Sequence, residues 1–275
     1  MRRDIVGNRR IVAGQLDLPF LATFGGASLL VWAVVGGISR LVAGRGAALA
    51  TVDGLAAAMT NTGFVALPVL HGLFGQRALL PAAIATLFVA VVMFPLAVVL
   101  LERSRGSGAD APARGSILRH TLTNPMVAPT LLGLAWAASG LPLPTIVDDY
   151  LGILAGALTP CALFAIGLGL HVQDIRHHAA AAALLTVIKL VGLPALALAI
   201  AWHLQLAPFP AVAAVICAAV PTAKTLFILG SEYGTGRELV AATIALTTLA
   251  SVASLLAWLV LLARLYPSVF PAGAG

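Results

Sequence analysis

The sequence predicts an all-α polytopic membrane protein with about eight transmembrane helices, and three observations support this prediction. Of the 275 residues, 60% are hydrophobic and 9% are charged, and the mean hydropathy is +1.03. The few charged residues lie between long apolar runs, which is the membrane pattern. No linker separates soluble domains, and the first apolar run is longer than a signal-peptide core. We therefore expect one integral membrane domain.

Each predicted transmembrane span has about the length that a helix needs to cross roughly 30 Å of hydrocarbon. The spans are residues 20–42, 51–73, 78–101, 117–139, 146–170, 179–202, 208–229 and 239–263. Most connections are short, so sequential helices should be antiparallel neighbours. The exception is the connection of residues 102–116, which is rich in Arg, Gly, Ser and Pro and which we expect to be a flexible cytoplasmic loop.

The arginines predict the orientation of the chain in the membrane. The net charge is +6, which in a soluble protein would suggest a nucleic-acid partner. Here the arginines lie in loops, so we interpret them as topology determinants and expect no nucleic acid. A cytoplasmic 102–116 loop also places Arg40, Arg45, Arg176 and Arg237 inside, and it places Arg77 and Arg264 outside. Arg2, Arg3, Arg9 and Arg10 then fall outside, against the positive-inside rule.

The seventh span is interrupted in its middle. Pro221 removes a helix hydrogen bond there, and Lys224 places a cation near the middle of the membrane. Discontinuous helices whose freed backbone groups face a cavity form the substrate sites of many secondary transporters. This break is therefore the main functional signal in the sequence.

The second span repeats the pattern of the seventh. AAMTNTGFVALPVLHGLFG, from Ala57, and AAVPTAKTLFILGSEYG, from Ala218, both begin with two alanines, contain a Thr-containing polar break and a proline, and end in an aromatic residue and glycine. The seventh span comes five spans after the second, and each successive span crosses the membrane in the opposite direction. An odd number of crossings therefore gives the two spans opposite directions. The pattern predicts an inverted repeat whose two broken helices meet near the midplane.

Five motifs follow one another along most of the chain. They are NTGFVALPVLHGLFG from Asn61, TNPMVAPTLLGLAWAASGLPLP from Thr123, LTPCALFAIGLGL from Leu158, IKLVGLPAL from Ile188 and VPTAKTLFILGSEYG from Val220. In this order and spacing they resemble the auxin efflux carrier family, the bacterial relatives of plant auxin exporters. The resemblance implies ten helices in two inverted five-helix repeats, with two broken helices that cross. It also implies transport of organic anions by an elevator-like movement, in the cell membrane, which would be a bacterial inner membrane.

The chain departs from the family pattern at its N-terminal side. Three predicted helices precede the long loop where the family has five, so the first two helices look absent. We expect residues 20–101 to be a three-helix remnant of the first repeat and residues 117–264 to be the complete second repeat, flanked by tails of residues 1–19 and 265–275. Thr60 stands where many relatives have proline, which predicts a less sharp break in the second span than in the seventh.

The candidate substrate-binding residues come from the two breaks. Lys224 could pair with a substrate carboxylate or be a tolerated ion in a wet crevice. Asn61 could donate its amide to the same carboxylate or to a freed backbone carbonyl. Pro68 and Pro221 are interpreted as breaks that shape the site. The full predicted set is Asn61, Thr62, Pro68, Pro221, Thr222, Lys224 and Thr225.

Three further residues are candidates for coupling to a proton or sodium ion. Lys189 lies deep in the sixth span, where it could couple protons or tie to a backbone carbonyl. Asp53 and Glu232 lie near the ends of spans, where we expect them to be solvated.

Enzyme motifs are absent from the sequence: it contains neither His-Glu-x-x-His nor Gly-x-Ser-x-Gly. We expect no enzyme activity, no cofactor, no metal site, and no disulfide between Cys161 and Cys217, which both lie in predicted spans. Gly152 and Gly156 form a small-residue face that permits close packing within the chain or a homodimer.

The sequence therefore predicts a secondary carrier, exporting small organic anions, driven by the membrane potential or a proton gradient. Two alternatives stay open: a truncated, non-transporting or regulatory membrane protein, and a carrier similar to the bile acid:sodium symporters.

Overall fold

The computed structural model describes residues 18–105, residues 172–270 and short pieces between residues 128 and 157. The predicted spans 117–139 and 146–170 lie largely outside the described residues. Most of the 102–116 loop, most of the N-terminal tail, the last five residues of the C-terminal tail, Cys161 and Gly156 also lie outside them. The described part of the chain is helical and contains no strand, which confirms the prediction of an all-α membrane protein.

The helices follow the predicted spans closely, with the two expected interruptions. The α-helices are α2 (Leu18–Leu41), α3 (Ala47–Ala58), α4 (Leu67–Phe74), α5 (Leu79–Phe88), α6 (Phe94–Arg105), α10 (Val172–Val187), α11 (Leu193–His203), α12 (Pro208–Ala219), α13 (Thr225–Glu232) and α14 (Arg237–Leu265). Among the described residues, four helical stretches are long and apolar enough to cross a membrane: 18–41, 62–104, 178–203 and 237–265. The stretch 62–104 turns at Gly75, whose φ of +66° favours glycine, so α4 packs against α5.

Three short π-helical segments each end two residues before a proline. They are Thr62–Ala66 before Pro68, Val89–Met93 before Pro95, and Ile188–Gly192 before Pro194. A proline has no N–H, so it cannot bond the carbonyl four residues earlier. For Pro194 that carbonyl belongs to Leu190, and it accepts hydrogen bonds from Ser254 at 3.1 Å and from the indole N–H of Trp258 at 2.9 Å. The missing helical bond is therefore replaced by a connection to α14.

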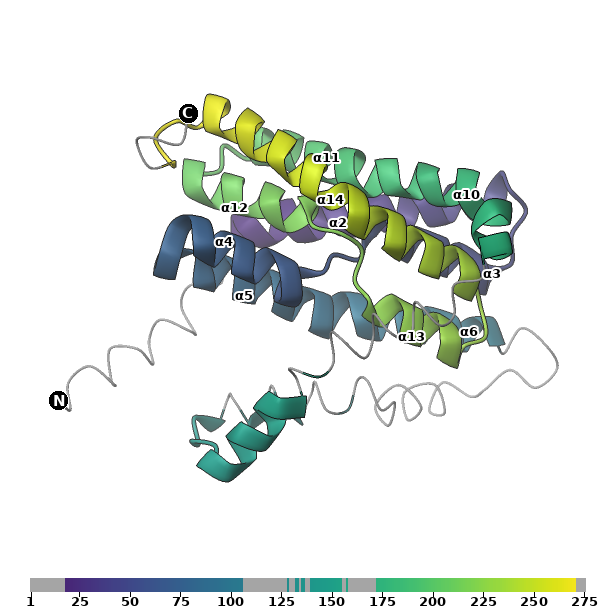
Figure 1. Ribbon diagram of the computed structural model, residues 1–275, viewed down its shortest axis with the longest axis horizontal. Helices are drawn as coiled ribbons and strands as arrows, with labels where there is room; N and C mark the ends of the chain where they lie inside the picture. The colour runs from purple at the N-terminus through teal and green to yellow at the C-terminus, as the bar shows by residue number, and fades with distance from the viewer. Residues whose placement is uncertain are drawn as a thin grey trace.

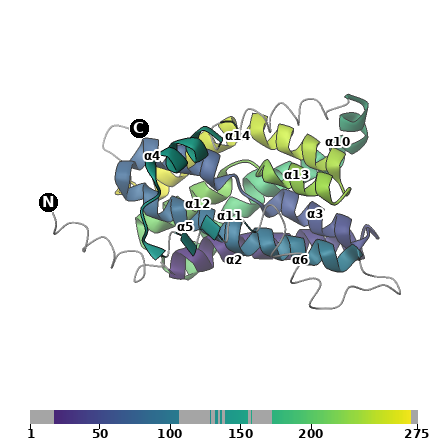
Figure 2. The same ribbon diagram turned by 90° about the horizontal axis from the view of Figure 1, so that it is seen from below.

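Helix α12 occupies the middle of the molecule. Its residues 211–219 are all buried, and it contacts α2, α5, α11 and α14 (Figure 1). In the turned view, α11 and α12 lie in the middle (Figure 2). Helix α14 lies on one side of this pair, and α2 and α5 lie on the other side. The core is therefore built around one half of the seventh predicted span.

The arginines divide between the two ends of the helical bundle. The end of α2, the start of α3, the end of α6 and the start of α14 lie together at one end (Figure 1). This end carries Arg40, Arg45, Arg103 and Arg237, and we call it the arginine-rich end. Arg77 lies at the opposite end, where its guanidinium packs 4.7 Å from the ring centre of Phe209 and donates to the carbonyl of Val269 at 2.8 Å. That the arginine-rich end is cytoplasmic stays a prediction.

Candidate functional site

The two interrupted helices cross where they are broken. The first ends with α3 at Ala58 and resumes at Thr62, and the second ends with α12 at Ala219 and resumes with α13 at Thr225. Between these points the two chains run antiparallel and pair at Thr60 and Thr222. The N–H of Asn61 donates to the carbonyl of Pro221 at 3.0 Å, and the N–H of Ala223 donates to the carbonyl of Met59 at 2.9 Å. The prediction of two crossing broken helices is confirmed.

The expectation that Thr60 makes the first break less sharp is wrong. Helix α3 ends fully, with Met59 in an extended conformation (ψ 113°), although no proline lies in this break. The reason is tertiary, because the backbone groups that leave the helix find partners on the other broken chain. The first break therefore forms without a proline.

Side chains from other helices satisfy the carbonyl groups that the breaks release. The hydroxyl of Thr222 donates to the carbonyl of Ala56 at 2.8 Å. The ammonium of Lys189 donates to the carbonyls of Ala218 at 2.7 Å and Val220 at 2.5 Å, at the C-terminal end of α12. Lys189 is completely buried, and a cation there also complements the negative end of the helix dipole. Of the two roles considered for Lys189, the geometry matches the structural tie to backbone carbonyls.

A cavity of about 190 Å³ lies on one side of the crossing, and we call it the crossover cavity. It lies below the roughly 300 Å³ at which pockets for drug-sized ligands begin, so it suits a small solute. Both broken chains line it, together with α5 and the segment that follows α5. Its lining residues are Met59, Thr60, Asn61, Thr62, Gly63, Phe64, Thr86, Val89, Ala90, Phe94, Ala223 and Thr225.

Several polar groups in the crossover cavity have no partner among the described residues. The Thr60 hydroxyl is buried without a hydrogen bond. The side chains of buried Asn61 and Thr62 and of partly buried Thr225 also have no hydrogen bond with another described residue. Since buried polar groups in proteins are nearly always hydrogen-bonded, these groups are available to a solute.

The backbone adds further donors to the crossover cavity. A half-helix begins at Thr62 and another begins at Thr225, and neither has a side-chain cap. The N-terminus of a helix carries the positive end of its dipole. At the start of α13, the N–H groups of Leu226 and Phe227 already donate to the carbonyls of Ala223 and Lys224, so this half-helix contributes its dipole more than free donors. None of the described residues that line the cavity is acidic. The site is therefore electropositive and rich in hydrogen-bond donors.

Four of the seven predicted substrate-binding residues do not line the crossover cavity. Pro221 and Thr222 are buried in the crossing itself, where they make the backbone and side-chain bonds described above. Pro68 lies beyond the break, exposed at the second residue of α4, because the π-helical segment separates it from the crossing. Lys224 is half-buried at the start of α13 beside Thr225, and its ammonium has no ion pair or hydrogen bond with a described residue. Asn61, Thr62 and Thr225 line the cavity as predicted.

Two polar residues of the cavity were missed from the sequence. Thr60 directly precedes Asn61 in the break, and this position could have identified it. Thr86 lies in α5, where its hydroxyl donates to the carbonyl of Ala82 at 2.8 Å. A single threonine in an apolar span gives no signal of this kind, because only the packing of α5 against the crossing places it there.

The expectation that Asp53 is solvated is wrong. Asp53 is only 4% exposed; Ser39 donates a hydrogen bond to its carboxylate, and Arg45 forms an ion pair with it at 2.9 Å. The hairpin of α2 and α3 causes this burial, because it places Ser39 and Arg45 on either side of Asp53. Glu232 is exposed at the last residue of α13. Neither carboxylate lines the crossover cavity.

Comparisons with known proteins identify a family of transporters. A family model described as "Membrane transport protein" matches residues 13–259. A protein of Rhizobium meliloti named "Putative malonate transporter" is 30% identical over 92% of this chain and 80% of its own length. An "Uncharacterized transporter" of Methanothermobacter thermautotrophicus is 30% identical over 76% of this chain and 67% of its own length. The "Uncharacterized transporter YfdV" of Escherichia coli K12 is 25% identical over 76% of this chain and 67% of its own length.

Proposed function

Because the chain belongs to the membrane transport protein family, the auxin efflux carrier family that its motifs predicted, we propose that it carries small organic anions. In this proposal the anion binds in the crossover cavity, between the two broken helices. The observation that carries the proposal is the group of polar side chains without partners at the crossing: Thr60, Asn61, Thr62 and Thr225. The buried Thr60 hydroxyl in particular destabilises the protein unless a solute completes its hydrogen bond.

The charge around the cavity favours an anion over a cation or a neutral solute. Two half-helices begin at the cavity, and each N-terminus carries about half an elementary charge. Lys224 adds a full charge next to the lining residue Thr225, although its own side chain does not line the cavity. Coulomb attraction strengthens as the effective dielectric constant falls, so these charges can replace part of the lost hydration of a carboxylate.

The size of the cavity favours a short dicarboxylate. About 190 Å³ leaves room for a small solute. The name of the Rhizobium meliloti relative makes malonate the first probe to test. Two carboxylates can be bound by the polar side chains and the two half-helix ends at once, which a monocarboxylate cannot fully exploit.

We further propose that transport is export driven by a proton gradient or the membrane potential, with sodium as the alternative coupling ion. Lys189 then supports the break, because both of its described partners are backbone carbonyls. Asp53 and Glu232 lie away from the cavity, so coupling through either would have to act by moving helices.

Calorimetry on the purified full chain tests the proposal, with malonate as ligand and its neutral diamide, malonamide, as the comparison. We expect malonate to bind and malonamide not to bind. Asn61→Asp places a carboxylate in the cavity and should abolish malonate binding by repulsion. Gln76→Leu changes an exposed amide far from the cavity and should leave binding unchanged. Equal binding of the diamide, or full affinity in Asn61→Asp, would show that the anion does not occupy this cavity.

A further inference from the structure

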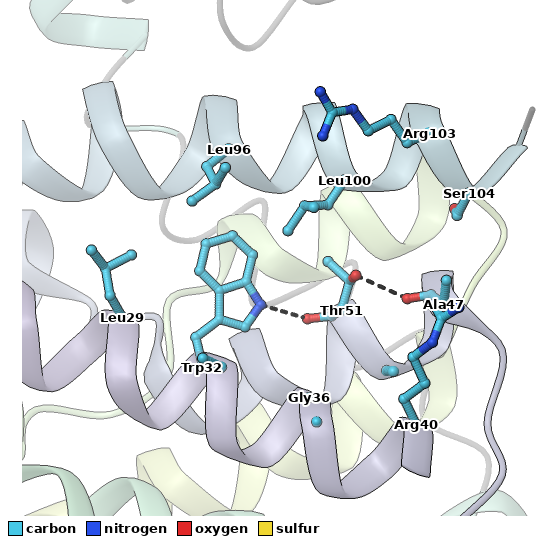
Figure 3. Close-up of a pocket in the computed structure, with 13 residues that line it drawn as sticks. Leu29, Trp32, Gly36, Arg40, Ala47, Thr51, Leu96, Leu100, Arg103 and Ser104 are labelled. Atoms are coloured by element: carbon cyan, nitrogen blue, oxygen red, sulfur yellow. Dashed lines mark hydrogen bonds between the residues drawn. The ribbon is translucent and has the colours of Figure 1, made fainter.

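A second and larger cavity, of about 610 Å³, lies between α2, α3 and α6 (Figure 3). None of the residues that line the crossover cavity lines this one. Its inner part is apolar, with Leu29 on α2 and Leu96 on α6. The indole N–H of Trp32 is already bonded to the carbonyl of Thr51 at 3.1 Å, so that side chain presents its ring to the cavity.

Two arginines lie at the outer end of this cavity. Arg40 is in the last turn of α2 and Arg103 is near the end of α6, so both belong to the arginine-rich end. Figure 3 shows both residues toward one end of the cavity, with Leu29 and Leu96 toward the other end; Arg40 reaches toward Ala47, and the guanidinium of Arg103 lies over α6. Neither guanidinium makes a hydrogen bond or ion pair with a described residue.

Among the described residues, no carboxylate is paired with either of these two arginines. Glu102 accepts a hydrogen bond from the hydroxyl of Tyr233 at 2.8 Å, and Asp53 is paired with Arg45. The N-terminus of α3, which begins at Ala47 in the same cavity, has no side-chain cap and adds the positive end of a helix dipole. The outer end of the cavity thus attracts an anionic group, while its apolar inner walls favour a hydrophobic chain attached to that group.

We propose that this cavity binds an anionic phospholipid, with the head group at the end that carries Arg40 and Arg103 and one acyl chain along Leu29, Leu96 and Leu100. The proposal rests on charge complementarity at the membrane surface. Basic pockets between transmembrane helices recognise anionic head groups, and an acyl chain is stabilised by every methylene that it buries. A small, strongly hydrated anion would gain nothing from the apolar walls. This site is independent of the proposed transport activity.

Native mass spectrometry of the purified full chain, with phosphatidylglycerol and phosphatidylcholine added in turn, tests the site. We expect one phosphatidylglycerol to stay bound, at least tenfold more tightly than phosphatidylcholine. Arg40→Gln and Arg103→Gln should each weaken phosphatidylglycerol binding about fivefold. Arg237→Gln removes a charge at the same end outside the cavity and should leave it unchanged.

A pair of glycine variants on α2 tests the apolar part of the site. Gly37 lines the cavity and Gly26 does not, and a Cβ at either position meets no atom within 4 Å. Gly37→Leu should therefore fill the cavity and abolish phosphatidylglycerol binding, whereas Gly26→Leu should preserve it. Thermal unfolding of both variants in detergent checks that they are folded.

Four outcomes would overturn the proposal. Three are equal binding of the two lipids, unchanged binding in the double variant that combines Arg40→Gln and Arg103→Gln, and retention of phosphatidylglycerol in Gly37→Leu. Glycerol 3-phosphate serves as the head group without chains, and binding of it as tight as that of the lipid would also contradict the proposal.

Discussion

The hydroxyl group of Thr222 donates a hydrogen bond to the carbonyl oxygen of Ala56 at 2.8 Å, and this bond joins the two broken helices. Ala56 lies in the last turn of α3, where carbonyl groups lose their helical partners. Thr222 is completely buried in the opposite break. The crossing is therefore held by side chains as well as by its paired backbones.

Replacing Thr222 by valine should destabilise the protein, because valine keeps the shape of the side chain and leaves the Ala56 carbonyl without its donor. A buried acceptor without a partner costs about 1–3 kcal/mol. The matched control is Thr243→Val, since that buried hydroxyl donates only to Leu239 within its own helix. Thermal unfolding in detergent compares the two, and equal melting temperatures would contradict the proposed role of Thr222.

Lys189→Met should lower the melting temperature more than Thr222→Val. It removes the donor to two carbonyl groups, those of Ala218 and Val220, and each costs about 1–3 kcal/mol when left unsatisfied. Lys224→Met is the control, because its ammonium has no described partner and its loss should change stability little. A melting temperature for Lys189→Met that matches the control would show that the two carbonyls do not depend on the lysine.

Thr60→Val should weaken malonate binding without destabilising the protein. The hydroxyl has no partner among the described residues, so valine removes only a group that is available to the ligand. Hydrogen bonds to charged groups contribute about 1.5–3 kcal/mol, and calorimetry should find a loss of that size. Thr23 provides a close control, since its hydroxyl is also buried without a described partner but lies outside the cavity. Equal affinities of the two valine variants would remove Thr60 from the site.

Lys224→Ala should weaken malonate binding about tenfold, which is roughly 1.4 kcal/mol. The loss is smaller than for a fully buried pair because Lys224 is half-buried, and salt should reduce it further. Lys224→Arg should retain most of the affinity. Calorimetry at low and high salt measures both effects. Unchanged affinity of Lys224→Ala at low salt would show that this lysine does not bind the anion and is only an ion tolerated in a water-filled crevice.

The sequence by itself was sufficient for the fold class and for the position of the crossing. Long apolar runs predict membrane helices because backbone polar groups must be satisfied within each segment in lipid. Pro221 and the similar stretch around Asn61 predicted two breaks, and the odd number of steps between them predicted opposite directions. Those features depend on the local sequence and on counting.

Only the tertiary structure decided which polar groups at the crossing are satisfied and which are available. Thr222 and Ala56 are separated by 166 residues, and Lys189 lies 29 residues before the carbonyl of Ala218. Neither hydrogen bond could be predicted from the spacing of the residues in the sequence, because each depends on how whole helices pack. The same packing buries Asp53 against Arg45, leaves Pro68 on an exposed face, and places Thr60 rather than Thr222 in the cavity. Buried polar groups take the partners that the fold brings to them, and local sequence does not specify those partners.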